Sequence, residues 1–317
     1  MNKILVFRTD RIGDFLVSAP IFSSLKRKYK NCKVDIVCSN LNYDYIKSFE
    51  FFNKVFLYPD NFLNKLSFYL NLNNYDHILV LDGKKRSIYT SIFKRSINKT
   101  LFTPSTSIKN LFKYFFNNVY FIDYNIPKIN LINNYLLNIN CDFNSIDINF
   151  LSNYENSKFL KYKRLNTNYI ILNFDEKWIY KSYIKSYKNI EPTSSQLISF
   201  IKSISKNNKI IIVNGYFENA LLQELKFKDY IKKNKNIIIK DKINIFELQF
   251  LIKYSDCLIT CHGAPSHIAS NYNIKVIDII DNSEIKFFES YNYHFRNKVQ
   301  IIRDDFNRLS KKIIENI

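Results

Sequence analysis

The chain has 317 residues, of which 46% are hydrophobic, so it can bury one large core or two of medium size. No apolar run reaches the roughly 18 residues that cross a bilayer, and charges between Arg8 and Asp14 interrupt any leader-like segment, so we expect a cytoplasmic protein. The net charge of +19 favours anionic partners, but the lysines lie throughout a chain rich in Asn and Ile, as is typical of an AT-rich genome.

In the first half, short β-branched runs alternate with amphipathic segments. We expect strands over 3–7, 33–38, 54–58 and 77–82, and helices over 14–30, 41–49 and 61–73. Such alternation predicts a parallel sheet with helical crossovers. Between 84 and 160 the pattern is weaker and indicates only helices near 107–117 and 128–140.

A second series of the same kind begins near residue 168. It predicts strands over 168–174, 209–215, 236–240, 256–260 and 275–280, and helices over 194–206, 217–231, 244–255 and 265–272. The polar segment 152–168 is the predicted linker. We therefore expect an α/β chain with two Rossmann-like domains whose parallel sheets face a central cleft.

The predicted domains cover 1–160 and 161–302, and a terminal helix follows over 303–317. We expect this helix to pack back on the N-terminal domain.

The segment RTDRIGD places Arg8, Asp10, Arg11, Gly13 and Asp14 between the first strand and the first helix. Gly13 permits a tight turn or a close backbone approach. Asp14 can cap the N–H groups that open the helix, or it can accept a proton from a substrate hydroxyl in a cleft. The spacing alone leaves both roles open.

The segment SDCLITCHGAPSHIAS (255–270) predicts a strand, a turn of small residues and a helix. The N–H groups around Gly263, Ala264 and Ser266 would point out of the helix N-terminus, which suits a diphosphate. We expect His267, one turn into the helix, to face the same cleft. The alternative is a plain turn with a histidine satisfied in the core.

The segment NFDEKWIYK (173–181) follows the first strand of the second series. Lys177 can reach a phosphate as a point charge. Trp178 either packs under a ligand, wedges the domain seam or anchors a surface loop. Glu218, after VNGYF, can bind a ribose hydroxyl or serve as a first-turn helix acid.

The cysteines raise the question of a metal site. Cys257 and Cys261 are four apart, with His262 and His267 near them. The spacing matches none of the usual structural zinc patterns, and a second ligand pair is missing. Buried or loop thiols are the better interpretation.

Two stretches, ILVFRTDRIGDFLVSAPIFSSLKRKY and LITCHGAPSHIASNYNIKVIDI, resemble glycosyltransferase family 9, whose best-known members are the lipopolysaccharide heptosyltransferases. The resemblance implies a GT-B fold, a nucleotide-sugar donor bound by the C-terminal domain and an acceptor held by the N-terminal domain. It implies an inverting transfer that needs no metal or other cofactor. The first expectation is heptose from ADP-heptose, moved to a lipopolysaccharide core or another surface glycan.

The resemblance also assigns roles to residues. Asp14 matches the general base, Lys177 the lysine that neutralises the donor diphosphate, and His267 the histidine of the nucleotide-binding segment. The diphosphate turn matches Gly263 and Ala264 with their neighbours, and Glu218 loosely matches the acid that contacts the nucleoside.

On the acceptor side, the resemblance places the loop of Arg8, Asp10, Arg11 and Gly13 next to an anionic glycan or glycolipid. The family's usual Asp at the turn is replaced here by Cys261 and His262, and His262 can donate to a phosphate or a ribose.

Two other functions remain open. One is a GT-B-like protein that binds a nucleotide or glycan without transfer. The other is a nucleic-acid binder, which rests on charge alone, since no zinc-finger, KH or RNP motif is present and we expect no nucleic acid partner. The basic and aromatic segment from Lys109 to Phe116 can rest on the cytoplasmic face of an anionic inner membrane, although a core-facing amphipathic helix is the favoured interpretation.

Overall fold

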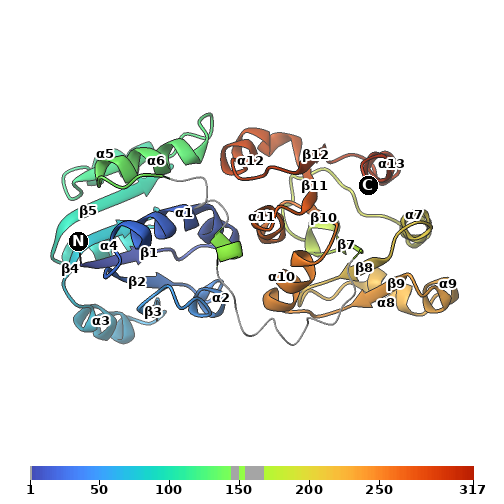
Figure 1. Cartoon of the computed structure of the whole chain (residues 1–317), viewed down its shortest axis with the longest axis horizontal. Helices are drawn as coiled ribbons and strands as arrows, with labels where there is room; N and C mark the ends of the chain where they lie inside the picture. Colours follow the sequence, from blue (N-terminus) through green and yellow to red (C-terminus); the bar gives the residue numbers. More distant parts are fainter. Residues whose placement is uncertain (1, 144–149, 154–167) are drawn as a thin grey trace. The chain divides into compact units, whose positions relative to one another are not determined.

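The computed structural model describes residues 2–143, 150–153 and 168–317, and the chain divides into two compact units (Figure 1). Unit 1 comprises 1–154 and 289–293, and unit 2 comprises 155–288 and 294–317. Unit 1 thus takes in a short segment that the sequence analysis placed in the second domain. The predicted boundary at 160 and nearly all of the predicted linker lie outside the described residues.

Unit 1 is built on a parallel sheet with the strand order β3-β2-β1-β4-β5-β6. Its strands are β1 (Lys3–Phe7), β2 (Lys33–Cys38), β3 (Lys54–Leu57), β4 (Tyr75–Val80), β5 (Ser96–Thr103) and β6 (Asn118–Phe121). In the centre, Ile4 is in register with Val34 on one side and His77 on the other. The central strands read as continuous apolar runs because helices cover both faces of the sheet.

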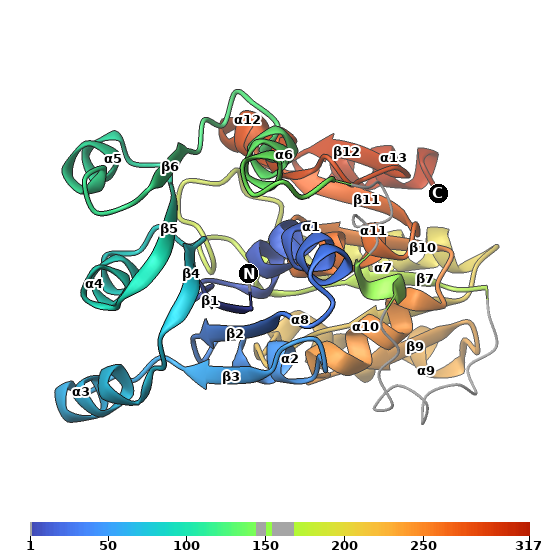
Figure 2. The same cartoon turned by 60° about the vertical axis from the view of Figure 1, so that its left-hand side comes forward.

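Three helices cover one face of this sheet (Figure 2): α3 (Phe62–Asn71), α4 (Lys85–Phe93) and α5 (Thr106–Phe112). The other face carries α1 (Ile12–Lys28) and α6 (Lys128–Asn138), with Tyr135 of α6 packed on Phe102 of β5. Two short elements complete the unit, α2 (Tyr43–Lys47) beside β3 and η2 (Phe150–Asn153) beside α1. The elements α4, β5 and β6 fall in the stretch where the sequence pattern was weak.

Unit 2 repeats the plan with the strand order β12-β11-β10-β7-β8-β9, again all parallel. Its strands are β7 (Ile170–Asn173), β8 (Ile210–Val213), β9 (Ile237–Lys240), β10 (Cys257–Cys261), β11 (Lys275–Ile280) and β12 (Lys298–Ile302). The prediction of an α/β chain with two Rossmann-like halves is confirmed.

The helical elements of the second half are η4 (Glu176–Trp178), α7 (Ser194–Ser205), α8 (Ala220–Lys226), α9 (Asp229–Lys233), α10 (Ile245–Lys253), α11 (Ala264–Asn271), η5 (Asn282–Glu284), α12 (Ile285–Tyr291) and α13 (Phe306–Glu315). The single helix expected over 217–231 is two helices, because Lys228 between them has extended backbone with ψ of 129°.

The terminal helix α13 packs within unit 2. It contacts α7 and β12, and Phe306, Leu309 and Ile313 join the unit 2 core. The expectation that this helix returns to the N-terminal domain is therefore corrected, because its apolar stripe is filled by α7. In the part of the chain that the structure describes, no helix combines the length and the hydropathy needed to cross a bilayer.

Candidate functional site

Both sheets share one strand order. In each sheet, successive strands are first added toward one edge and then toward the other, so the order reverses at one place. In unit 1 this is between β1 and β4, and in unit 2 between β10 and β7. In open α/β sheets, ligands bind beyond the carboxyl ends of the strands at such a point. The residues that follow these four strands therefore form two candidate clusters, one in each unit.

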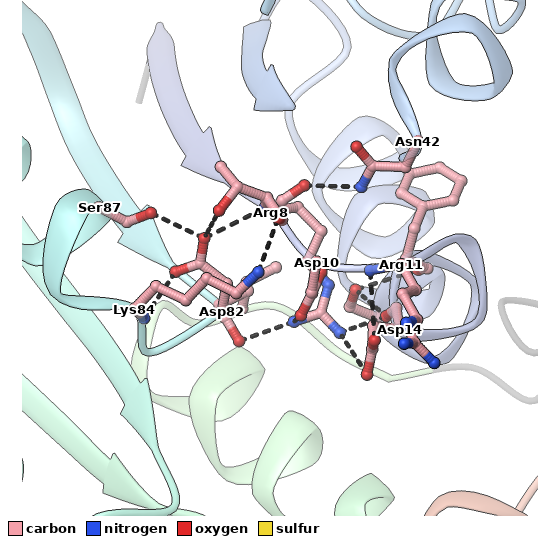
Figure 3. A network of polar contacts seen from close by, with 12 residues as sticks. Arg8, Asp10, Arg11, Asp14, Asn42, Asp82, Lys84 and Ser87 are labelled. Carbon is pink, nitrogen blue, oxygen red and sulfur yellow. Dashed lines mark hydrogen bonds and ion pairs between the residues drawn. The ribbon is translucent and has the colours of Figure 1, made fainter. Parts of the chain in front are cut away.

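Arg8 follows β1 directly, and only 1% of it is exposed. Its Nη1 donates to Leu81 O at 2.7 Å and lies 3.2 Å from Asp10 Oδ2. Its Nη2 donates to the carbonyl of Asp14 and lies 3.7 Å from Asp14 Oδ1 (Figure 3). Burial alone would lower the pKa of Arg8, but the two carboxylates raise it overall, so the guanidinium stays charged. Arg8 is thus placed to organise the carboxylates from beneath rather than to meet a ligand from solvent.

Asp14 is the third residue of α1, and 30% of its side chain is exposed. Its Oδ2 accepts a long hydrogen bond of 3.4 Å from the N–H of Arg11 at the start of the helix. Both roles that the sequence left open thus have support in the geometry: the carboxylate caps the helix, and it remains open to solvent.

Asp10 is the second carboxylate of the cluster, with 18% of its side chain exposed. Among the described residues, its Oδ1 has no hydrogen-bond partner. Burial raises the pKa of Asp10 from 3.8 to about 7, although Arg8 opposes the shift. This carboxyl group therefore exchanges its proton near neutral pH.

The two remaining predicted residues of the loop lie at the start of α1. Arg11 is exposed at the N-cap, and Gly13 lies in the first turn of the helix. Gly13 does not have a positive φ, so of the two roles that its lack of a side chain permits, a left-handed turn is not used and a close backbone approach stays a prediction. Among the described glycines the positive φ belongs to Gly83, after β4, where an added Cβ would lie 2.9 Å from Phe102 O.

Asp82 ties the loop after β4 to the loop after β1, a role that the sequence analysis missed. Its Oδ2 accepts from Thr9 N at 3.1 Å, Thr9 Oγ1 at 2.6 Å and Ser87 Oγ at 2.7 Å (Figure 3). Lys84 Nζ and Arg86 Nη2 both donate to Thr9 O, at 2.8 and 2.9 Å. A carboxylate placed directly after a buried apolar strand was the available signal. The network brings two more cations to the cluster.

Lys128, the first residue of α6, is a further cation that the sequence analysis missed. It is 4% exposed, and its Nζ donates to Tyr291 OH at 3.2 Å and lies 4.2 Å from the centre of that ring. Burial and the repulsion of Arg8 lower the pKa of Lys128 to about 7, against the attraction of Asp14 and Asp10. Nothing in the local sequence marks this lysine, since its burial depends on residues more than 100 positions away.

In unit 2, Lys177 lies in η4, directly after β7. Its Nζ is 3.0 Å from Asp175 Oδ2, and 13% of the side chain is exposed. Burial would lower the pKa of Lys177, but the Asp175 carboxylate raises it overall, so the ammonium stays charged. A Cβ added to Gly263 would lie only 2.6 Å from Lys177 Nζ. The ammonium therefore lies against the backbone that opens α11, which brings together two residues that the sequence predicted for one site.

The N-terminus of α11 offers fewer N–H groups than we expected. Pro265 has none, and Ser266 N donates to Gly263 O at 3.0 Å. The Ser266 hydroxyl donates to Asp278 Oδ1 at 2.8 Å and is itself the acceptor, at 3.4 Å, for Gly263 N. The first N–H groups of a helix have no acceptor within the helix. Of the groups named here, this leaves the N–H of Ala264 as the one that can donate to a ligand.

His262 is held by a carboxylate from the neighbouring strand. Its Nδ1 lies 2.8 Å from Asp278 Oδ2, and Asp278 is fully buried in β11. The imidazole also packs against the Phe288 ring, with centroids 4.2 Å apart. An acidic residue thus does reach the turn, although the turn itself carries Cys261 and His262. The sequence analysis missed Asp278 because it lies inside a predicted strand, although the stretch that carries the family resemblance includes it.

His267 is 4% exposed, and its Nδ1 lies 3.1 Å from His294 Nε2. His294 is also buried, and this burial lowers its pKa to about 3. These contacts favour the alternative interpretation, a histidine satisfied in the core, over a side chain that faces a cleft.

Arg303, after β12, is a second unit 2 residue that the sequence analysis missed. It is 7% exposed, donates to the carbonyl of Lys177 and lies 3.8 Å from Cys261 Sγ. Burial raises the pKa of Cys261 to about 12, so its thiol stays protonated. All five cysteines are free and buried, and within the described ranges no three His, Cys, Asp or Glu side chains gather as metal ligands.

Two residues of the predicted donor side have other surroundings. Glu218 has 85% of its side chain exposed and lies 3.5 Å from Lys242 Nζ, before α8. Trp178 is fully buried, stacks on Phe174 at 5.2 Å and donates Nε1–H to Asn173 O at 2.8 Å. Trp178 therefore anchors η4 in the core of unit 2.

Solved structures with the same fold are found among sugar-nucleotide enzymes. The chain is similar over 99% of its length to 97% of the E. coli heptosyltransferase WaaC with ADP, at 12% identity and a TM-score of 0.68. It is similar over 98% of its length to 89% of the family 9 glycosyl transferase from Veillonella parvula, at 13% identity and a TM-score of 0.66. UDP-GlcNAc 2-epimerase from Methanocaldococcus jannaschii matches over 100% of the chain and 92% of its own, at 14% identity and a TM-score of 0.60.

No family model matches the chain, and no curated protein matches it by sequence. At identities this low the structural similarity shows the fold alone. The protein therefore has the GT-B fold of the heptosyltransferases, a fold that also carries nucleotide-sugar epimerases.

Proposed function

We propose that the protein is an inverting glycosyltransferase that moves a sugar from a nucleotide-sugar to a hydroxyl of an anionic glycan or glycolipid. The observation that carries the proposal is the contact of the Lys177 ammonium with Gly263 at the start of α11. This contact lies beyond the ends of the neighbouring strands β7 and β10, where this fold class binds nucleotides. A cation and an open helix N-terminus together suit a diphosphate.

In the reaction, Asp14 takes the proton of the acceptor hydroxyl. The freed oxygen bonds to the anomeric carbon while the bond from that carbon to the diphosphate oxygen breaks, and the nucleoside diphosphate leaves with the electron pair. Lys177 and the first N–H of α11 stabilise the charge that develops on the leaving group. Because these groups supply the neutralisation that a metal ion supplies elsewhere, we propose that no metal or other cofactor takes part.

For the acceptor, we propose a glycan with phosphate or carboxylate groups, such as a lipopolysaccharide core at the cytoplasmic face of the inner membrane. Arg11, Lys84 and Arg86 lie beside the carboxylates after β1 and β4 and provide positive charge for it. ADP-heptose is the first donor to test, since two similar solved structures contain ADP and an ADP-heptose analogue. His262, Ser266, His267 and Glu218 remain proposed donor-side residues, and His262 is the best placed of them.

The test separates donor binding from transfer. Nucleoside diphosphates and sugar nucleotides are screened by thermal shift, and release of the diphosphate is then measured with glycan acceptors. Asp14→Asn should lower turnover by about 10²–10⁴-fold and leave donor binding unchanged, because a general base acts only in the chemical step. Lys177→Ala should weaken donor binding itself.

Matched controls exist for both variants. Asp44→Asn removes an exposed first-turn carboxylate from α2, and Lys185→Ala removes an exposed lysine from the loop after η4. Both should behave as wild type. Donor binding without transfer to any acceptor would favour the binding protein, conversion of the donor sugar without acceptor would favour an epimerase, and no donor binding would end the proposal.

A further inference from the structure

The three helices on one face of the unit 1 sheet form a continuous layer with an apolar outer side. In this layer, Tyr69 OH of α3 donates to Phe93 O of α4. The Tyr89 ring of α4 packs edge-on against Phe112 of α5, with centroids 5.8 Å apart. Figure 2 shows α3, α4 and α5 along this outer side of the sheet. Six large apolar side chains on the layer are 49–83% exposed, namely Leu63, Leu66, Leu70, Phe93, Leu111 and Tyr114, and we call these six the outer apolar surface.

Helix α3 is apolar on both sides. Phe68 faces inward, packed on Phe56 of β3 with ring centroids 5.9 Å apart. Leu63, Leu66 and Leu70 follow at i, i+3 and i+7 and are 75%, 49% and 69% exposed. A helix on the surface of a globular protein usually carries polar residues on that side, whereas the single charge of α3 is Lys65. A second apolar stripe of this kind indicates an apolar partner.

The end of α5 and the turn that follows it divide their large apolar residues in the same way. Phe112 and Phe116 are buried against the sheet, while Leu111 and Tyr114 are 64% and 83% exposed. The favoured interpretation of this segment as a core helix is therefore correct for one side only, and the other side extends the outer apolar surface.

The charge around this surface is strongly positive. Residues 61–117 contain nine Lys and Arg but only two acidic residues, a net charge of +7 in 57 residues, compared with +19 for all 317. Two of the nine, Lys84 and Arg86, belong to the network at Thr9, and the other seven are left for this surface. Both acidic residues are engaged within unit 1: Asp76 accepts from the N–H groups of Asn2 and Lys3, and Asp82 accepts from Thr9. A surface that exposes apolar side chains and carries many more cations than carboxylates has the composition of a surface that binds anionic lipid.

A hollow at the amino end of β5 continues this surface. Its volume is about 630 Å³, and its lining includes Phe93, Ile97, Lys94, Arg95 and Lys99. The lining also holds one carboxylate, Asp76, which accepts from the N–H groups of Asn2 and Lys3. Phe93 and Ile97 are 70% and 74% exposed. Lys94 and Lys99 donate to backbone carbonyls at 2.9 and 2.8 Å, which leaves Arg95 as the exposed cation of the hollow. The hollow therefore offers both apolar walls and positive charge to a phospholipid headgroup.

We propose that the outer apolar surface of unit 1 docks on an anionic lipid bilayer. The leucines of α3, together with Phe93, Leu111 and Tyr114, enter the interface, and the surrounding lysines and arginines contact the headgroups. The proposal deepens the proposed function by giving the acceptor side of the protein a place beside a lipid-linked acceptor. The binding itself requires neither donor nor catalysis.

The test is cosedimentation of the full chain with vesicles of phosphatidylcholine, alone or mixed with phosphatidylglycerol. The wild type should bind the mixed vesicles and not the neutral ones, and added salt should weaken the binding. A variant with Leu63→Gln, Leu66→Gln and Leu70→Gln should lose about tenfold or more in affinity, and so should one with Lys65→Glu, Lys109→Glu and Lys113→Glu. The three leucines and three lysines that are replaced are all exposed, so both variants should fold, and circular dichroism checks this.

The matched control lies in unit 2, where exposed Phe227 is followed by the exposed lysines Lys232 and Lys233 of α9. Phe227→Gln with Lys232→Glu and Lys233→Glu should bind vesicles as the wild type does. Failure of the wild type to bind anionic vesicles would overturn the proposal, and so would full binding by the leucine variant. A wild-type dimer that the leucine variant abolishes would assign the surface to a second copy instead. A protein that binds vesicles but transfers no sugar would retain this proposal and lose the proposed function.

Discussion

Arg8 explains why so many charges follow the first strand. A guanidinium that is 1% exposed requires negative partners nearby, and the loop supplies them within six residues as Asp10 and Asp14. Each carboxylate is then held in a different environment: Asp14 stays open to solvent, and Asp10 is more buried, with a raised pKa. One buried cation thus creates two acidic groups that can do different tasks in proton transfer.

The stability of the protein should reflect the titration of Asp10. Its pKa is about 7 in the folded chain and about 4 when unfolded, so between these values the folded state holds a proton that the unfolded state has released. The contribution of Asp10 to the free energy of unfolding is therefore present near pH 4 and lost as the pH rises to 7. Relative to Asp10→Asn, the wild type should lose about 1–4 kcal/mol over this range.

Urea denaturation at several pH values measures this difference. Asp44→Asn is the control, because Asp44 is an exposed first-turn carboxylate on α2, and its difference from the wild type should stay nearly constant. Lys128 acts over another range: its pKa is lowered to about 7, so its contribution rises with pH above 7. A difference between the wild type and Asp10→Asn that does not vary from pH 4 to 7 would contradict the raised pKa.

Local sequence identified several of the site residues that lie just beyond a strand, although it missed Asp82 after β4. Lys177 and Gly263 follow β7 and β10, and the structure brings them together because those strands are neighbours. Lys128 and Arg303 escaped notice because what sets them apart is burial by distant segments. A lysine or arginine in a short stretch of sequence looks the same whether it ends in solvent or in the core.

At the scale of an element, α13 shows which part of packing a sequence pattern determines. Phe306, Leu309 and Ile313 recur at helical spacing, and this spacing predicts a helix with one apolar stripe. The stripe does not say which surface it covers, since any apolar surface of suitable shape would accept it. In the structure, Phe306 meets Phe200 of α7 with ring centroids 5.7 Å apart, and the helix closes the unit 2 core.

Removing the centre of that stripe should destabilise unit 2. Leu309 is fully buried, so Leu309→Ala leaves a cavity and should lower the free energy of unfolding by about 2–5 kcal/mol. Ile314→Ala on the same helix is the matched control, because Ile314 is 40% exposed, and its effect should be about 1 kcal/mol or less. Urea denaturation compares the two. Equal effects of the two variants would mean that α13 does not belong to the core.

At the scale of the whole molecule, the two units follow one plan, and the alternation of strands and helices was enough to predict it. What the pattern could not predict is the exchange of chain between them: 289–293 belongs to unit 1, although the residues on both sides of it belong to unit 2. Tyr293 OH bonds to Val17 O, and Tyr291 OH accepts from Lys128. These are contacts between positions far apart in sequence, and no local periodicity records them.

Because each unit has its own sheet and core, the two should unfold in separate transitions. Trp178 is the single tryptophan of the chain and is fully buried in unit 2, so its fluorescence reports the unfolding of that unit, whereas far-UV circular dichroism reports both.

A nucleoside diphosphate at about 100 times its dissociation constant should stabilise unit 2 by roughly 2.7 kcal/mol. The fluorescence transition should then move to higher urea, together with only one part of the circular dichroism transition. Leu309→Ala should move the same part to lower urea, and Asp10→Asn should move the other part. If both probes instead follow one transition that every change shifts, the exchanged segment couples the units into a single cooperative whole.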